Sequence, residues 1–285
     1  MAHFVMSAFA DEAATDLDGQ IEALMEEDIS MIELRGVDGV NCADLSKEDA
    51  ARIHKKLKEH HISLSALGSP YGKISITDDF EEHLAKFKRS LEVCDILECS
   101  CIRMFSFYMP EGEKPEKYRD EVMHRLEKMV DMAQKSGILL VHENEKGIYG
   151  DNDIRCKELY DYFGGRIGVV FDPANYVQCK VDPMEAYRRQ KDTITYFHMK
   201  DALKENGSVV SVGHGDGSVP EILKDIKDSG RKEVILTIEP HLHVFKGLDA
   251  LQGETVQHVE SYSDSRTAFH AACEALRNCL KILEK

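Results

Sequence analysis

Four side chains able to bind metal and move protons recur through the second half of the chain. They are Glu143, Asp172, His198 and Glu239, spaced by 29, 26 and 41 residues. Each follows or ends a short apolar run, and a charged group at the end of a buried segment needs a partner. One divalent cation would partner all four, and three carboxylates with an imidazole suit Mn²⁺, Mg²⁺, Co²⁺ or Zn²⁺. The oxygen-rich set favours Mn²⁺ or Mg²⁺, and we expect Mn²⁺. The alternative is four loop residues with unrelated partners.

Further polar residues stand at matching places in the pattern. Arg35 and Arg103 end two earlier apolar runs, where they could hold a substrate hydroxyl, carboxylate or phosphate, or form a salt bridge at the rim. Lys200 follows His198 by two positions, so both side chains share one face of a strand and Lys200 could orient a substrate oxygen. His214 lies in the glycine-rich segment 213–217, which is equally compatible with a substrate contact and a plain turn.

The elements that must position these residues alternate regularly along the chain. Short apolar runs predict strands over 3–8, 29–35, 62–67, 101–106, 137–143, 167–172, 193–199 and 233–239. Helical spacing follows each run, at about 15–26, 46–60, 78–98, 114–136, 153–163, 182–191, 219–229 and 263–283. Eight strand–helix units predict an α/β fold, a single (β/α)8 TIM barrel spanning residues 1–285, whose active site lies at the carboxyl ends of the strands. A doubly wound open sheet is disfavoured, because no G-x-G-x-x-G follows the first strand.

Composition limits the partners. The chain has 285 residues, 42% of them hydrophobic, and a net charge of −16, which argues against nucleic acid or an anionic membrane surface as a partner. No stretch approaches the ~20 apolar residues that cross a bilayer. The first residues lack the pattern of a signal peptide, and eight scattered cysteines do not suggest a disulfide framework. We therefore expect a cytoplasmic protein with reduced thiols.

Several segments together resemble a known family. They are IELRG at 32–36, IRMFSF at 102–107, HENEKGIYGD at 142–151, FDPANY at 171–176, HMKDA at 198–202, GHGDG at 213–217 and IEPHL at 238–242. The chain resembles the xylose isomerase-like TIM-barrel superfamily, in the branch of sugar phosphate isomerases and epimerases. The resemblance implies that Glu143, Asp172, His198 and Glu239 bind the metal and that the two glutamates also move the proton. Asn175 stands where ketose 3-epimerases often carry a substrate-binding histidine, and an amide can donate a hydrogen bond but cannot carry a proton.

The expected function is a divalent-metal-dependent isomerase or epimerase acting on a sugar or sugar derivative. It would abstract a proton next to a carbonyl and pass through a metal-stabilised enediolate. Two alternatives remain: an inosose dehydratase-like or 3-keto-glycoside-processing enzyme using the same site, and a carbohydrate-binding barrel without activity. Phosphodiester cleavage is disfavoured, because it needs more histidine ligands and a basic groove. The irregular stretch 242–262 is expected to cover the site or to form an interface in a homo-oligomer.

Overall fold

Eight parallel strands close into a barrel in the computed structural model, which describes residues 2–243, 260 and 262–284. Their order around the barrel is β1, β12, β9, β8, β7, β6, β5 and β2, and the last pairs again with the first. The strands are β1 (His3–Ala8), β2 (Met31–Leu34), β5 (Ser63–Leu67), β6 (Cys101–Met104), β7 (Leu139–Glu143), β8 (Ile167–Phe171), β9 (Ile194–Met199) and β12 (Glu233–Ile238). The predicted (β/α)8 barrel is confirmed, with every predicted strand present and several shorter than expected.

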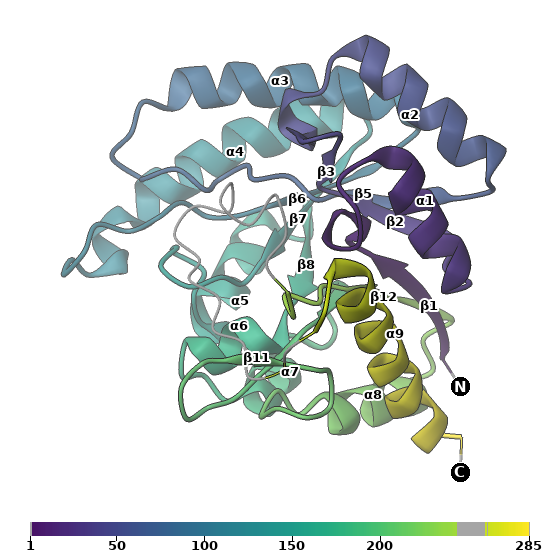
Figure 1. Cartoon of the computed structure of the whole chain (residues 1–285). Helices are drawn as coiled ribbons and strands as arrows, with labels where there is room; N and C mark the ends of the chain where they lie inside the picture. The colour runs from purple at the N-terminus through teal and green to yellow at the C-terminus, as the bar shows by residue number, and fades with distance from the viewer. Residues whose placement is uncertain (1, 244–259, 261, 285) are drawn as a thin grey trace.

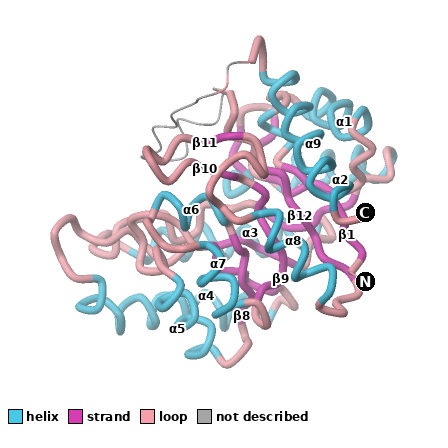
Figure 2. Tube along the Cα trace, turned by 90° about the horizontal axis from the view of Figure 1, so that it is seen from below, coloured by secondary structure: helices cyan, strands magenta, loops and turns pink. Residues whose placement is uncertain are grey.

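Helices surround the strands on the outside of the barrel (Figures 1 and 2). They are α1 (Leu17–Glu26), α2 (Lys47–Glu59), α3 (Phe80–Ile96), α4 (Arg119–Lys135), α5 (Asp153–Phe163), α7 (Pro183–Gln190), α8 (Val219–Asp228) and α9 (Ser265–Ile282). Most begin at a side chain that accepts a hydrogen bond from the first turn, as Ser46 does from the backbone of Asp49 before α2. These caps explain why the predicted helix starts lie within a few residues of the observed ones.

The loops at the carboxyl ends contain elements that the sequence did not predict. A short helix, α6 (Pro173–Gln178), follows β8 directly, because Asp172 accepts a hydrogen bond from the backbone of Asn175 and Pro173 occupies the first turn. Two antiparallel ribbons join β3 (Gly36–Val37) to β4 (Val40–Asn41) and β10 (Asp201–Ala202) to β11 (Val209–Val210). Short 3₁₀ turns span Ala10–Glu12, Cys42–Asp44 and Pro115–Tyr118. Strands of two residues are too short to show an alternation of apolar and polar residues, so the sequence alone does not predict them.

The buried hydrophobic residues form one large cluster and two small ones. The large cluster lies between the strands and the helices, and all five residues of β8 are buried, as expected for a parallel strand covered on both faces. A separate cluster fills the barrel interior with Ala66, Val141, Val170 and Tyr196, each from a different strand. The interior is therefore a packed floor, and polar side chains gather above it.

The loop after β5 is fixed against the loop after β6. The backbone of Phe105 donates to the carbonyl of Tyr71 at 2.7 Å, and that of Phe107 donates to the carbonyl of Gly72 at 2.9 Å. Gly72 has a φ of +90°, and a Cβ there would lie 2.1 Å from the carbonyl oxygen of Phe105. Only glycine fits this close backbone approach.

We expect Gly72→Ala to lower the free energy of unfolding by more than about 2 kcal/mol, because left-handed strain and overpacking add together. Gly39→Ala is the matched control: its φ is +81°, but nothing lies within 4 Å of the added methyl group, so it should cost about 1 kcal/mol. Urea unfolding of both variants measures the difference. Equal losses would show that the loop yields to the added methyl group.

The structure bears on two further expectations, the lack of a membrane-spanning segment and the role of the stretch 242–262. Among the described residues, no helix combines the length and apolarity that a bilayer crossing requires. The prediction for stretch 242–262 falls largely on residues outside those described.

Candidate active site

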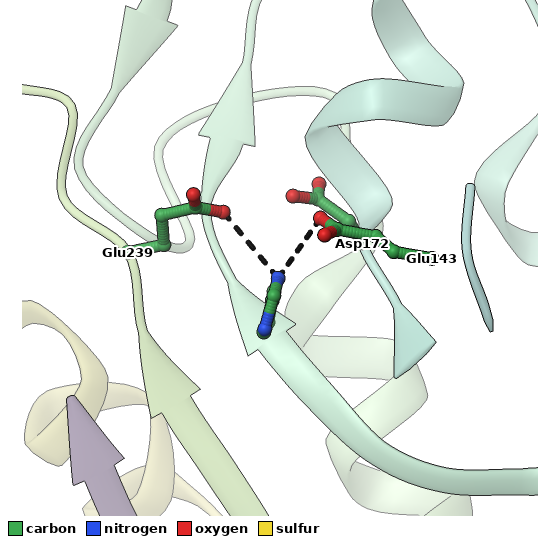
Figure 3. A group of neighbouring side chains, drawn as sticks. Glu143, Asp172 and Glu239 are labelled. Atoms are coloured by element: carbon green, nitrogen blue, oxygen red, sulfur yellow. Dashed lines mark hydrogen bonds and ion pairs between the residues drawn. The ribbon is translucent and has the colours of Figure 1, made fainter. Parts of the chain in front are cut away.

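The four predicted ligands come together at the carboxyl end of the barrel. Glu143 ends β7, Asp172 follows β8, His198 lies in β9 and Glu239 follows β12. All four are buried, and one potential ligand atom from each lies within 4.8 Å of the others. Figure 3 shows Glu239 on one side of the group and Glu143 with Asp172 on the other. Residues that span 96 positions of the chain (143–239) are adjacent because neighbouring parallel strands end at one rim.

His198 lies at the centre of this group, and its two ring nitrogens have different partners. Nδ1 lies 2.9 Å from Glu143 Oε1 and 3.4 Å from Glu239 Oε2. Nε2 lies 3.0 Å from Oε2 of Glu33, whose other oxygen accepts a hydrogen bond from Tyr196 at 2.9 Å. Burial is outweighed by Glu143 and Glu33, which raise the pKa of His198 well above its usual value, so both ring nitrogens carry a proton and donate to these carboxylates. A cation at the cluster would take the place of the Nδ1 proton, while Glu33 keeps the proton on Nε2. Glu33 was not among the predicted residues.

Burial and neighbouring charges act in opposite directions on these groups. Burial disfavours the charged form of Glu143, but His198 and Arg103 outweigh it and hold the pKa of Glu143 at about 2. Burial raises the pKa of Asp172 to about 7, and the attraction of Lys200 only partly offsets it. For Glu239, burial is outweighed by Lys200 and His241, which hold its pKa well below the usual value. The two glutamates are therefore ionised at neutral pH.

Four of the predicted substrate-binding residues contact the cluster directly: Arg103, Lys200, Asn175 and Arg35. Arg103 donates to Glu143 Oε2 at 2.9 Å and to the carbonyl of Gly68 at the same distance. The Lys200 ammonium lies 3.0 Å from Asp172 Oδ2 and 3.3 Å from Glu239 Oε2. The side chain of Asn175 donates to Glu143 Oε1 at 3.4 Å. Each of the three carboxylates thus has a cationic partner.

Arg35 forms salt bridges at the rim and also reaches the cluster, whereas its contact with a substrate stays a prediction. Its guanidinium donates two hydrogen bonds to Asp11, at 2.9 and 3.0 Å, and one to Glu12 Oε1 at 3.0 Å. A fourth donor lies 3.3 Å from Glu239 Oε1. Asp11 and Glu12 were not among the predicted site residues, although two adjacent acids in the loop after the first strand were a signal.

A second acidic group shares Glu239 with the first. Glu12, Glu239 and His241 offer ligand atoms within 4.8 Å of one another. This group offers two carboxylates where the first offers three, and burial raises the pKa of Glu12 to about 8, so this acid is protonated at neutral pH. Arg35 bridges Glu12 and Glu239. This group is better described as an arginine-bridged network than as a second metal site.

The structure does not bring His214 to the cluster. Its side chain is 70% exposed, and Nδ1 lies 3.8 Å from Glu260 Oε1. The glycines around it wrap a different group: the backbones of Gly213, Gly215 and Gly217 donate to the carboxylate of Asp201 at 2.8–3.0 Å. Of the two interpretations of this segment, the geometry favours a turn built around Asp201.

Comparisons with known proteins agree with this fold. A family profile described as a xylose isomerase-like TIM barrel matches residues 22–281. The chain belongs to this family. No curated protein sequence matches it at a significant level.

Solved structures of several other proteins align over nearly the whole chain. L-ribulose 3-epimerase is 15% identical with a TM-score of 0.75, covering 100% of this chain and 96% of its own. The IOLI protein, solved with a bound zinc atom, is 15% identical with a TM-score of 0.75, covering 98% and 99%. A probable 3-DHS dehydratase from Bacillus anthracis is 15% identical with a TM-score of 0.72, covering 98% and 99%. At this identity the likeness shows the shared fold.

The donor set of this xylose isomerase-like barrel fits a divalent cation. Three carboxylates and an imidazole nitrogen converge, and three of the four are held in place by groups outside the set. Glu33 orients His198, Arg103 orients Glu143, and Asn144 clamps the backbone of Asp172 with hydrogen bonds of 2.8 and 2.9 Å. Such outer contacts are typical of sites that bind a metal tightly.

Proposed function

We propose that this protein is a divalent-metal-dependent isomerase or epimerase that acts on a sugar or a sugar derivative. The observation that carries the proposal is the convergence of Glu143, Asp172, His198 and Glu239, with two ionised glutamates on different sides of the group. We infer that Mn²⁺ is the ion, because three of the four donors are carboxylates. The whole chain 1–285 would serve as one catalytic domain in the cytoplasm.

The chemistry begins with a proton on a carbon next to a carbonyl. Bound by the four ligands, the cation would act as a Lewis acid that polarises the carbonyl oxygen and so acidifies this proton. One glutamate, Glu143 or Glu239, accepts the proton through a carboxylate oxygen. The other then donates a proton from the opposite side. Return to the same carbon from the other face gives an epimer, and return to the neighbouring carbon gives the aldose–ketose isomer.

The remaining residues hold the reacting groups in place. Arg103 keeps Glu143 ionised and fixed, and Lys200 does the same for Glu239. Asn175 presents an amide beside Glu143, which can donate a hydrogen bond to a substrate oxygen. Because an amide does not titrate, proton transfer is assigned to the two glutamates alone.

Glu33 offers a test of the metal-binding role of His198. We expect Glu33→Gln to weaken Mn²⁺ binding by about 10- to 100-fold, because the amide no longer fixes the tautomer and orientation of the ring. Tyr196→Phe is the control, since it removes the hydrogen bond to Glu33 and leaves the carboxylate in place. Calorimetric titration with Mn²⁺ measures both. If Glu33→Gln bound Mn²⁺ as the native protein does, the proposed ligand role of His198 would be lost.

Product analysis by NMR separates the members of this reaction class. The protein with Mn²⁺ would be incubated with ketoses, aldoses, their phosphates, inososes and 3-keto-glycosides. We expect a new epimer or isomer from at least one of them. A product that has lost water would identify the dehydratase alternative, which shares the first step and has a structural neighbour in the probable 3-DHS dehydratase. Binding without conversion of any compound would favour the carbohydrate-binding alternative.

A further inference from the structure

A cavity of about 240 Å³ opens beside the cluster, at the carboxyl-terminal rim of the barrel. Its walls come from the loops after β2 and β5, from β6 and from the first turns of α3. Two of its lining residues also contact the cluster. The guanidinium of Arg103 lies 2.9 Å from Glu143, and that of Arg35 lies 3.3 Å from Glu239. The cavity therefore begins one side chain away from both proposed proton-transfer groups.

The charges that line this cavity are mostly positive. Arg35, Lys73, Lys86 and Arg103 line it, whereas Asp44 is the one carboxylate among its described lining residues. The carboxylates paired with the three most buried cations do not line the cavity, and those of Arg35 are Asp11, Glu12 and Glu239. Glu145 holds Lys73 at 3.0 Å and Glu143 holds Arg103, but neither acid lines the cavity. The described lining residues therefore carry more positive than negative charge.

The cations are held rigidly and away from water. The side chains of Arg35, Arg103 and Lys73 are 3%, 4% and 7% exposed. Lys73 belongs to the loop fixed by Gly72, whose backbone donates to His83 Nε2 at 3.0 Å. Burial lowers the pKa of His83 to about 4, so at neutral pH this ring is an uncharged partner that fixes the loop. Preorganised charges in a buried site interact with a ligand more strongly than the same charges in water.

We propose that this cavity binds an anionic group of the substrate, a carboxylate or a phosphate, while the carbonyl end of the same molecule lies at the four-ligand cluster. The inference rests on the proposed function and narrows its substrate class to sugar acids or sugar phosphates. An anion adds Coulomb attraction to the hydrogen bonds that it accepts from charged donors, and a neutral hydroxyl does not. A free sugar would leave the cations of the cavity without this gain.

Direct binding tests the cavity without requiring turnover. Isothermal titration calorimetry at low salt would use the full chain with inorganic phosphate, glycolate as a small carboxylate, and glycerol as a neutral probe. We expect phosphate or glycolate to bind and glycerol not to bind. The anion that binds more tightly shows whether the substrate carries a phosphate or a carboxylate. Lys86→Met should weaken that binding about tenfold, and Lys86→Arg should restore most of it. Lys86 suits the test because it is only half-buried and pairs with the exposed Asp44.

Lys88→Met is the matched control, since it removes the same charge from α3 but does not line the cavity. An equal loss from Lys88→Met would show unspecific attraction and overturn the proposal. So would anion binding that needs Mn²⁺ and ignores Lys86→Met, or the absence of binding by both anions. The proposed function can fail separately. Anion binding that depends on Lys86, with no conversion of any sugar acid or sugar phosphate, would support the anion site and contradict the proposed reaction. Conversion of neutral sugars alone, unaffected by Lys86→Met, would support the proposed reaction and contradict the role of the cavity as an anion site.

Discussion

Glu239→Gln is expected to lower the rate of proton exchange between substrate and solvent by about a thousandfold. The substitution keeps the size of the side chain and an oxygen that can bind a cation, but it removes the carboxylate that accepts or returns the proton. General acid–base groups contribute roughly 10²- to 10⁴-fold to such rates. The measurement is deuterium uptake by the substrate in D₂O, followed by NMR at saturating Mn²⁺.

The control for this variant lies on the same strand. Glu233→Gln changes the charge equally, but Glu233 is the exposed first residue of β12, at the opposite end of the barrel. Its exchange rate should match that of the native protein. Full exchange by Glu239→Gln with Mn²⁺ bound would contradict the assignment of Glu239 to proton transfer.

Mn²⁺ is expected to stabilise the fold, and Asp172→Asn to remove most of that stabilisation. At a concentration of 100 times Kd, a ligand that binds only the folded state adds about 2.7 kcal/mol, which corresponds to a rise in Tm of about 5 °C for a chain of this size. Asp172 is buried against Lys200, and its carboxylate is one of the three proposed oxygen donors. The asparagine keeps the cap of α6 but loses the ion pair with Lys200, so the rise in Tm on adding Mn²⁺ is taken against the metal-free Tm of the same variant.

Asp182→Asn provides the comparison for this experiment. Asp182 caps α7 by accepting hydrogen bonds from Met184 and Glu185, and it is not one of the converging ligands. The variant loses the same charge and should keep the full Mn²⁺-dependent rise in Tm. Equal rises in native protein and Asp172→Asn would place the metal elsewhere. No rise with Mn²⁺, Mg²⁺, Co²⁺ or Zn²⁺ would remove the metal from the account.

The barrel and the four converging residues could be predicted because both depend on local pattern. Each strand is a short apolar run, and the residue that ends the run lies at the rim in any barrel of this kind. The spacing of Glu143, Asp172 and His198 follows from one strand–helix unit per interval. No knowledge of side-chain contacts was needed to place them at the same rim.

The outer contacts could not be predicted in the same way, because they join distant strands. Glu33 meets His198 across 165 positions of the chain, and this pairing depends on which strands face each other through the barrel. A glutamate within the apolar segment MIEL was nevertheless a signal, since a buried charge there requires a partner. His214 shows the opposite problem: a histidine among glycines was a reasonable candidate, but the fold uses those glycines to surround Asp201.

The most direct test is the uptake of solvent deuterium at a carbon next to a carbonyl, measured by NMR with and without metal. The native protein would be incubated in D₂O with the panel of sugars, sugar acids and sugar phosphates, once with Mn²⁺ and once with a chelator. The account predicts that at least one compound exchanges a carbon-bound proton with Mn²⁺, and that the chelator stops the exchange. Exchange that continues undiminished in the chelator, or none on any compound while Mn²⁺ is bound, would contradict it.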